Sequence, residues 1–169
     1  ATLLGFTILK PVHLLWINLI TDCFPALSLS MEQPDDDIMR RPPRSSKEGI
    51  FAGGMAFDIF YQGLLITLIV FAAYFIGHFR DTGSWIVWHD LNESRHGMTM
   101  AFLTMSMCEI FHSFNMRSQR GSVIKMSLRG SHNMPLFGAM VASLVLTTAV
   151  IEIPFLANAF GFTLIGFAE

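Results

Sequence analysis

Four long apolar segments, separated by polar loops, dominate the chain. They run over about residues 12–31, 55–79, 98–116 and 134–156. Each is close to the roughly 20 residues that a helix needs to cross a hydrocarbon core about 30 Å thick. The first and third are near the short limit, which suits helices that are buried against neighbours or locally broken. The pattern predicts an all-α integral membrane bundle of about four transmembrane helices.

Composition supports a membrane protein and excludes several other classes. Of 169 residues, 52% are hydrophobic and 14% are charged, against about 25% charged in soluble domains. No basic domain is present, so we expect the lipid bilayer and no nucleic acid as a partner. The chain opens in apolar sequence at Ala1 rather than at Met, which suggests a segment of a longer protein. Residues 1–9 are typical of a helix end or a membrane-surface loop that stops at Lys10-Pro11.

The basic residues predict how the helices are oriented. Eight of the 11 Lys and Arg residues fall in two loops, 32–54 and 117–133. They are Arg40, Arg41, Arg44, Lys47, Arg117, Arg120, Lys125 and Arg129. By the positive-inside rule both loops are cytoplasmic, so both chain ends, including a tail at 157–169, are expected outside. Trp85 and Trp88 belong to the outer loop, near the membrane interface.

The first apolar segment carries an oxygen-rich group of side chains. Asn18, Thr21 and Asp22 are spaced i, i+3 and i+4, which places them on one face of an α-helix. A charge at this depth costs roughly 3 kcal/mol on insertion scales, so it usually marks an ion or proton path. Pro25 has no N–H, so the Thr21 carbonyl loses its helical partner. We therefore predict a helix that is unwound or kinked near Thr21–Pro25 and a site for a hard cation.

Glu109 is a second intramembrane carboxylate, in the third apolar segment. It is compatible with a protonated structural residue, but together with Asp22 it favours shared cation coordination or proton exchange. Two such carboxylates repel, and one takes up a proton unless a cation lies between them. His112, at i+3 from Glu109, is either a third polar group of this site or a packing residue. In the second segment, Gly63 and Gly77 are candidates for close helix contact.

Several motifs resemble the C-terminal membrane region of P-type cation-transporting ATPases, and most closely the calcium-pump branch. The resemblance extends from about Leu9 to Phe155, and the four segments correspond to helices six to nine of a ten-helix pump. The motifs are LLWINLITD (14–22), Pro25-Ala26, DIM (37–39), RPPR (41–44), MTMA (98–101), Glu109 and Asn115.

The resemblance implies roles for particular residues. Asn18, Thr21 and Asp22 match the family's cation ligands of helix six, and Glu109 matches the ligand of helix eight. Asn18 favours Ca²⁺ as the transported ion, because the related sodium and proton pumps tend to carry Asp there. The segment 34–44, otherwise compatible with a solvated linker, corresponds to a strip that contacts the phosphorylation domain.

The resemblance also implies what this chain lacks. It contains no phosphorylation motif, nucleotide-binding domain or actuator domain. ATP and Mg²⁺ would bind to those absent domains, which with helices one to five and ten are the expected partners. The isolated segment would be inactive, its cation shell would be incomplete, and it could self-associate.

Alternative functions remain open at this point. A pump for Mn²⁺, Mg²⁺ or Na⁺ uses similar oxygen ligands. A small channel or a proton-coupled carrier could instead use Asp22 and Glu109 as a relay.

Overall fold

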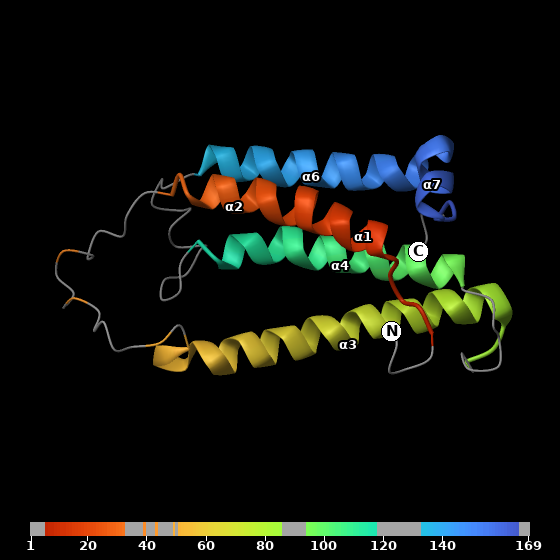
Figure 1. The fold of residues 1–169 in the computed structure, drawn as a ribbon, viewed down its shortest axis with the longest axis horizontal. Helices are drawn as coiled ribbons and strands as arrows, with labels where there is room; N and C mark the ends of the chain where they lie inside the picture. The colour runs from red at the N-terminus through yellow and green to blue at the C-terminus, as the bar shows by residue number, and fades with distance from the viewer. Residues whose placement is uncertain are drawn as a thin grey trace.

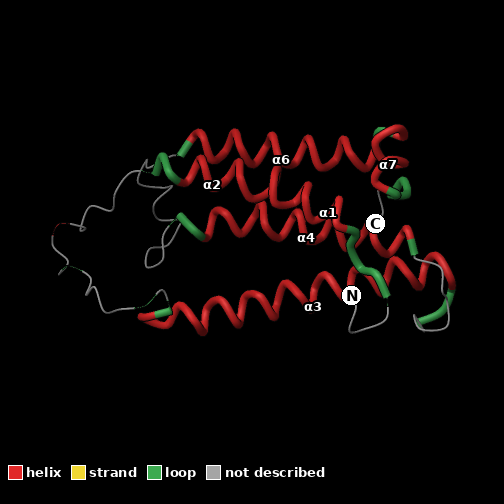
Figure 2. Tube along the Cα trace, viewed as in Figure 1, coloured by secondary structure: helices red, strands yellow, loops and turns green. Residues whose placement is uncertain are grey.

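The computed structural model describes residues 6–32, 39, 43, 49, 51–85, 94–117 and 133–165, and its described part is helical without strands. Its long helical elements form four rods. Figures 1 and 2 show these rods lying side by side, with successive rods running in opposite directions. The all-α bundle predicted from the apolar pattern is therefore confirmed. The rods comprise α1 (Pro11–Trp16), η1 (Ile17–Asp22) and α2 (Cys23–Leu29) in the first, then α3 (Met55–Thr82), α4 (Arg95–Asn115) and α6 (Met134–Glu152).

The first rod is continuous but changes its helix type in the middle. Pro11 occupies the first helical position of α1, where its missing N–H costs nothing. The backbone then widens into a π-helix over Ile17–Asp22 and returns to an α-helix at Cys23. The predicted local break is thus present as a widened turn that ends before Pro25, and the helix does not unwind.

Three of the described helical rods are long and apolar enough to cross a membrane by length and composition. They are Pro11–Leu29, Met55–Thr82 and Met134–Glu152. The α4 helix is of similar length but does not belong to this set. It packs against the first rod, α3 and α6, and it buries polar residues such as Thr99, Ser106 and Ser113. A helix enclosed by protein needs fewer apolar side chains, so four crossings remain our prediction.

The fourth rod ends earlier than the apolar pattern predicts. Its helix stops at Glu152 rather than continuing to residue 156, and Ile153 adopts an extended backbone. The cause is Pro154, which disfavours the helical conformation of the residue before it. The chain then forms α7 (Pro154–Phe160), so part of the segment predicted as an outer tail is helical.

A histidine joins the start of the first rod to α7. His13 is fully buried, and its Nδ1 accepts a hydrogen bond from the Lys10 backbone N–H at 3.1 Å. Its Nε2 therefore carries the hydrogen and donates to the Phe160 carbonyl at 2.8 Å. The rings of Phe102 and Phe162 pack against the imidazole, with centroids 5.6 and 4.5 Å away.

The α3 helix lies at one edge of the bundle and packs mainly on α4 (Figure 1). The two backbones meet at glycines: a Cβ added to Gly77 would lie 2.8 Å from the Gly97 Cα. The predicted close contact at Gly77 is confirmed. No atom lies within 4 Å of a Cβ added to Gly63, so that glycine makes no close contact with another described helix.

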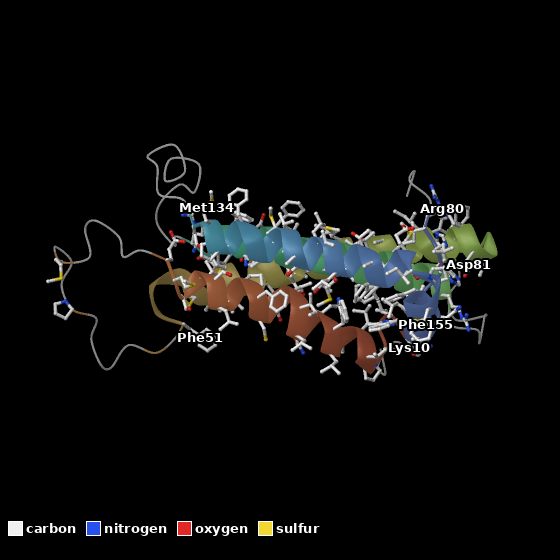
Figure 3. The ribbon with its side chains drawn as sticks, turned by 90° about the horizontal axis from the view of Figure 1, so that it is seen from above. Lys10, Phe51, Arg80, Asp81, Met134 and Phe155 are labelled. Atoms are coloured by element: carbon white, nitrogen blue, oxygen red, sulfur yellow. The ribbon has the colours of Figure 1, made fainter. Side chains whose placement is uncertain are left out.

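Charged side chains gather at both ends of the bundle. Figure 3 shows Lys10, Arg80 and Asp81 at the end opposite Met134. Most of the residues that predict the orientation lie outside the described part of the chain, and the orientation therefore remains a prediction. These residues are Arg40, Arg41, Arg44, Lys47, Trp88, Arg120, Lys125 and Arg129.

A buried ion pair lies at the Met134 end of the bundle. Arg117 donates to both carboxylate oxygens of Glu32, from Nε at 3.1 Å and from Nη2 at 2.8 Å. Its side chain is only 3% exposed. Asn133 Nδ2 donates to the same carboxylate at 2.7 Å, so Glu32 joins the ends of three helices.

The Glu32 carboxylate makes stability depend on pH. The hydrogen bond from Arg117 holds the pKa of Glu32 below its ordinary value. A lowered folded-state pKa stabilises the folded chain above the ordinary value and loses that stabilisation as the pH falls through the folded value. We expect the thermal midpoint in detergent to fall below about pH 4.5 more steeply in the wild type than in Glu32→Gln. Parallel curves would contradict a lowered pKa at Glu32, and Glu152→Gln, at an exposed acid, is the control.

Candidate functional site

The predicted ligands of the first rod lie on the π-helix. Such turns are rare and often occur at functional positions. Thr21 is 1% exposed and points into the bundle, whereas Asn18 and Asp22 are exposed on the surface of this chain. The three side chains therefore do not share one face, as an α-helix would require. The wider turn rotates Thr21 away from its expected position, and the sequence spacing could not reveal this.

Thr21 and Glu109 meet across the interface between the first rod and α4. Thr21 Oγ1 lies 2.7 Å from Glu109 Oε2 and 2.8 Å from the Ile17 carbonyl oxygen. The hydroxyl carries one hydrogen, so it donates to one of these two oxygens at a time. The contact joins residues 88 positions apart. It brings together the two helices on which the sequence predicts cation ligands.

Side chains also hydrogen-bond to the carbonyl groups of the π-helix. Ser143, from α6, donates to the Ile20 carbonyl at 2.8 Å. Cys23 Sγ contacts the Asn18 carbonyl oxygen at 3.0 Å. Neither residue was predicted to take part, because a serine or cysteine in an apolar segment is usually a small packing residue. These contacts matter because backbone groups at membrane depth need partners within the protein.

The two predicted acids lie on different helices, Asp22 at the end of η1 and Glu109 in α4. Two carboxylates at one site repel each other unless a proton or a cation lies between them. Among the residues that the structure describes, no group of three or more His, Cys, Asp or Glu side chains forms a metal site. His112 is half-buried, and no hydrogen bond between described residues joins it to Glu109. Within the described part of the chain, the acidic residues of the candidate site are therefore Asp22 and Glu109.

This arrangement has the chemistry of a partial cation shell. Asn18, Thr21, Asp22 and Glu109 offer amide, hydroxyl and carboxylate oxygens, which hard cations prefer. Ca²⁺ takes six to eight oxygen ligands, more than these four side chains supply unless both carboxylates bind through both oxygens. Asn18 and Asp22 face away from the described bundle. Further ligands would have to approach them from outside these four rods.

Comparisons with known proteins agree with these features. Residues 6–169 match the family described as "Cation transporting ATPase, C-terminus". The chain is 38% identical over 168 residues to a calcium-transporting ATPase 1 of Bacillus cereus, which covers 95% of this chain and 19% of that protein. It is 34% identical over 146 residues to a calcium-transporting ATPase of Bacillus subtilis, covering 86% of this chain and 15% of the relative.

A third relative carries a different ion in its name. A sodium/potassium exporting P-type ATPase 1 of Saccharomyces cerevisiae is 32% identical over 126 residues, covering 70% of this chain and 12% of that protein. The chain thus spans about a fifth or less of the length of these relatives. The family match extends over nearly the whole chain and includes all four predicted ligand positions. The chain therefore belongs to the cation-transporting ATPase family, of which it contains the C-terminal membrane region.

Proposed function

We propose that this chain is the membrane part of an ATP-driven pump that transports Ca²⁺. Its role is to supply part of the transport site, with Asn18, Thr21 and Asp22 from the first rod and Glu109 from α4 as ligands. The contact between Thr21 and Glu109 carries this proposal, because it holds oxygen atoms of two helices 2.7 Å apart at the depth of the π-helix. The names of the two Bacillus relatives favour Ca²⁺ among the possible cations.

The remaining parts of the pump would drive the transport. ATP and Mg²⁺ would bind in cytoplasmic domains outside this chain, and phosphorylation there would rearrange the helices around the cation. Movement of the first rod against α4 would change the distance between Thr21 and Glu109. Such a movement would alter the geometry of the ligand shell and hence its affinity for the cation.

The location of the pump forms part of the same proposal. We place it in the plasma membrane, with loops 32–54 and 117–133 on the cytoplasmic side. Single cysteines introduced into these loops should react with an impermeant thiol reagent only in inside-out vesicles. Labelling in right-side-out vesicles would mean that the two loops lie on the outer side and that the proposed orientation is wrong.

The experiment that tests the function is ATP hydrolysis by the full-length protein in lipid vesicles. Ca²⁺, Mn²⁺, Mg²⁺ and Na⁺ are titrated separately, with Mg²⁺ kept at the level that ATP requires in the other titrations. We expect activation by micromolar Ca²⁺. Activation by Na⁺ instead would favour the ion in the name of the yeast relative. No cation-stimulated hydrolysis would favour a channel or a proton-coupled carrier.

A change at Glu109 tests the contribution of α4. Glu109→Gln keeps the size of the side chain and its ability to bond to Thr21, but removes one negative ligand charge. We expect the Ca²⁺ concentration for half-maximal activation to rise about tenfold, because ligand charge tunes the affinity of oxygen sites. Glu152→Gln, at an exposed acid near the end of α6, is the control. Equal affinities in the two variants would make Glu109 a structural residue.

A further inference from the structure

The ion pair at the Met134 end of the bundle has a geometry that fixes helix positions. All three hydrogen bonds of Arg117 and Asn133 to Glu32 converge on one carboxylate, with Oε2 accepting two of them. Arg117 binds both oxygens through two different guanidinium nitrogens, and such a two-point contact restricts the relative orientation of the two groups. A slide by one helical residue, about 1.5 Å, would break this two-point contact.

Asn133 extends the same contact to α6. Its Nδ2 also donates to the Ser28 carbonyl in α2 at 3.0 Å. Its Oδ1 accepts from the Leu136 backbone N–H at 2.9 Å and thereby caps the start of α6. One residue therefore links the end of the first rod with the beginning of the fourth. We name Glu32, Arg117 and Asn133 the three-helix clamp.

The clamp is connected to the candidate cation site through rigid backbone. From Asp22, helix α2 and a hydrogen-bonded turn lead to Glu32, whose N–H donates to the Leu29 carbonyl at 3.0 Å. From Glu109, the end of α4 leads to Arg117, whose N–H donates to the Phe114 carbonyl at 3.3 Å. At about 1.5 Å per residue, these paths are roughly 15 and 12 Å long. The lengths are similar, so the clamp and the contact between Thr21 and Glu109 lie at matching positions along the first rod and α4.

We propose that the three-helix clamp is a positioning device that holds the ligands of the first rod in register with Glu109 and so sets the affinity for the cation. The clamp itself does not touch the cation. This inference rests on the proposed function of the site. Its support is that a buried ion pair contributes little net stability compared with apolar residues, while its best-attested use is to specify register. The hydrogen bond between Thr21 and Glu109 also depends on this register of the first rod against α4.

The test uses the full-length pump in lipid vesicles and measures ATP hydrolysis against free Ca²⁺. Arg117→Gln should raise the half-activating Ca²⁺ concentration about tenfold and leave the half-saturating ATP concentration unchanged. Arg117→Lys, which keeps the charge but loses the two-point contact, should give an intermediate value. If Arg117→Gln does not fold, the Ca²⁺ affinity of Arg117→Lys tests the proposal instead. Arg95→Gln, at an exposed arginine at the start of α4, should behave as the wild type.

A double variant separates positioning from mere stabilisation. Glu32→Met with Arg117→Met removes both charges, which is often neutral for stability. We expect its thermal midpoint to approach the wild-type value while its Ca²⁺ affinity stays low. If the double variant recovers both the thermal midpoint and the Ca²⁺ affinity of the wild type, the proposal is wrong. An unchanged Ca²⁺ affinity in the single Arg117 variants would also contradict it. If no cation activates the wild type, the proposed function fails instead, so the two failures are distinguishable.

Discussion

Replacing Asp22 by asparagine in the full-length pump is expected to abolish cation-stimulated phosphorylation by ATP. Asp22 is one of two carboxylates at the candidate site, and it lies on the exposed side of the π-helix. A unit charge pair at 4 Å is worth about 4 kcal/mol at an effective dielectric constant of about 20, and a divalent ion doubles this. Each 1.4 kcal/mol corresponds to about tenfold in affinity, so a loss of at least about a hundredfold is expected even after desolvation is subtracted.

The measurement is formation of the phosphorylated enzyme over a range of free Ca²⁺ concentrations. Asp58→Asn is a matched control, because Asp58 is an exposed aspartate in the first turn of α3 and takes no part in the site. The control should keep wild-type affinity. Normal Ca²⁺ affinity in Asp22→Asn would remove this residue from the ligand set and, with it, the main reason for placing the transport site on the first rod.

The sequence alone singles out the two carboxylates of the candidate site, and their role as ligands remains a prediction. A carboxylate within an apolar segment is energetically unusual, so Asp22 and Glu109 stand out without any structure. The partner of Glu109 was harder to predict. Thr21 was expected to face the same way as Asn18 and Asp22, but the π-helix turns it inward to Glu109. The π-helix also makes contacts across the bundle, such as the hydrogen bond from Ser143 to the Ile20 carbonyl, and these join residues too far apart for local spacing to encode.

The same difference between local and distant causes applies to the fold. Apolar length predicted the helical bundle, and a local rule about Pro154 explains the end of α6. The register of the bundle depends on contacts between residues that are far apart in sequence. Glu32 and Arg117, for example, form one such contact and are 85 residues apart. Gly97 was not predicted to matter, because only its packing against Gly77 reveals its role. Residues of one helix do not indicate which partner they will meet.

The contact between Gly77 and Gly97 leads to the second large expected effect. Gly77→Ala would place a Cβ 2.8 Å from the Gly97 Cα and 3.0 Å from both the Gly97 nitrogen and the His96 carbonyl oxygen. All three atoms belong to the backbone, so no side chain can rotate away, and α3 must separate from α4. Overpacking of this kind costs about 1–3 kcal/mol. We expect the thermal midpoint of the detergent-solubilised protein to fall by several degrees.

Gly63→Ala is the matched control, since it makes the same substitution in the same helix. A Cβ at this position meets no atom within 4 Å. Alanine also stabilises a helix interior by about 0.5–1 kcal/mol relative to glycine. The two variants should therefore shift the midpoint in opposite directions. A stabilised Gly77→Ala variant would mean that α3 is not held against α4 by direct backbone packing. The opposite shifts would instead identify the crossing of these glycines as the point where α3 is attached to the helix that carries Glu109.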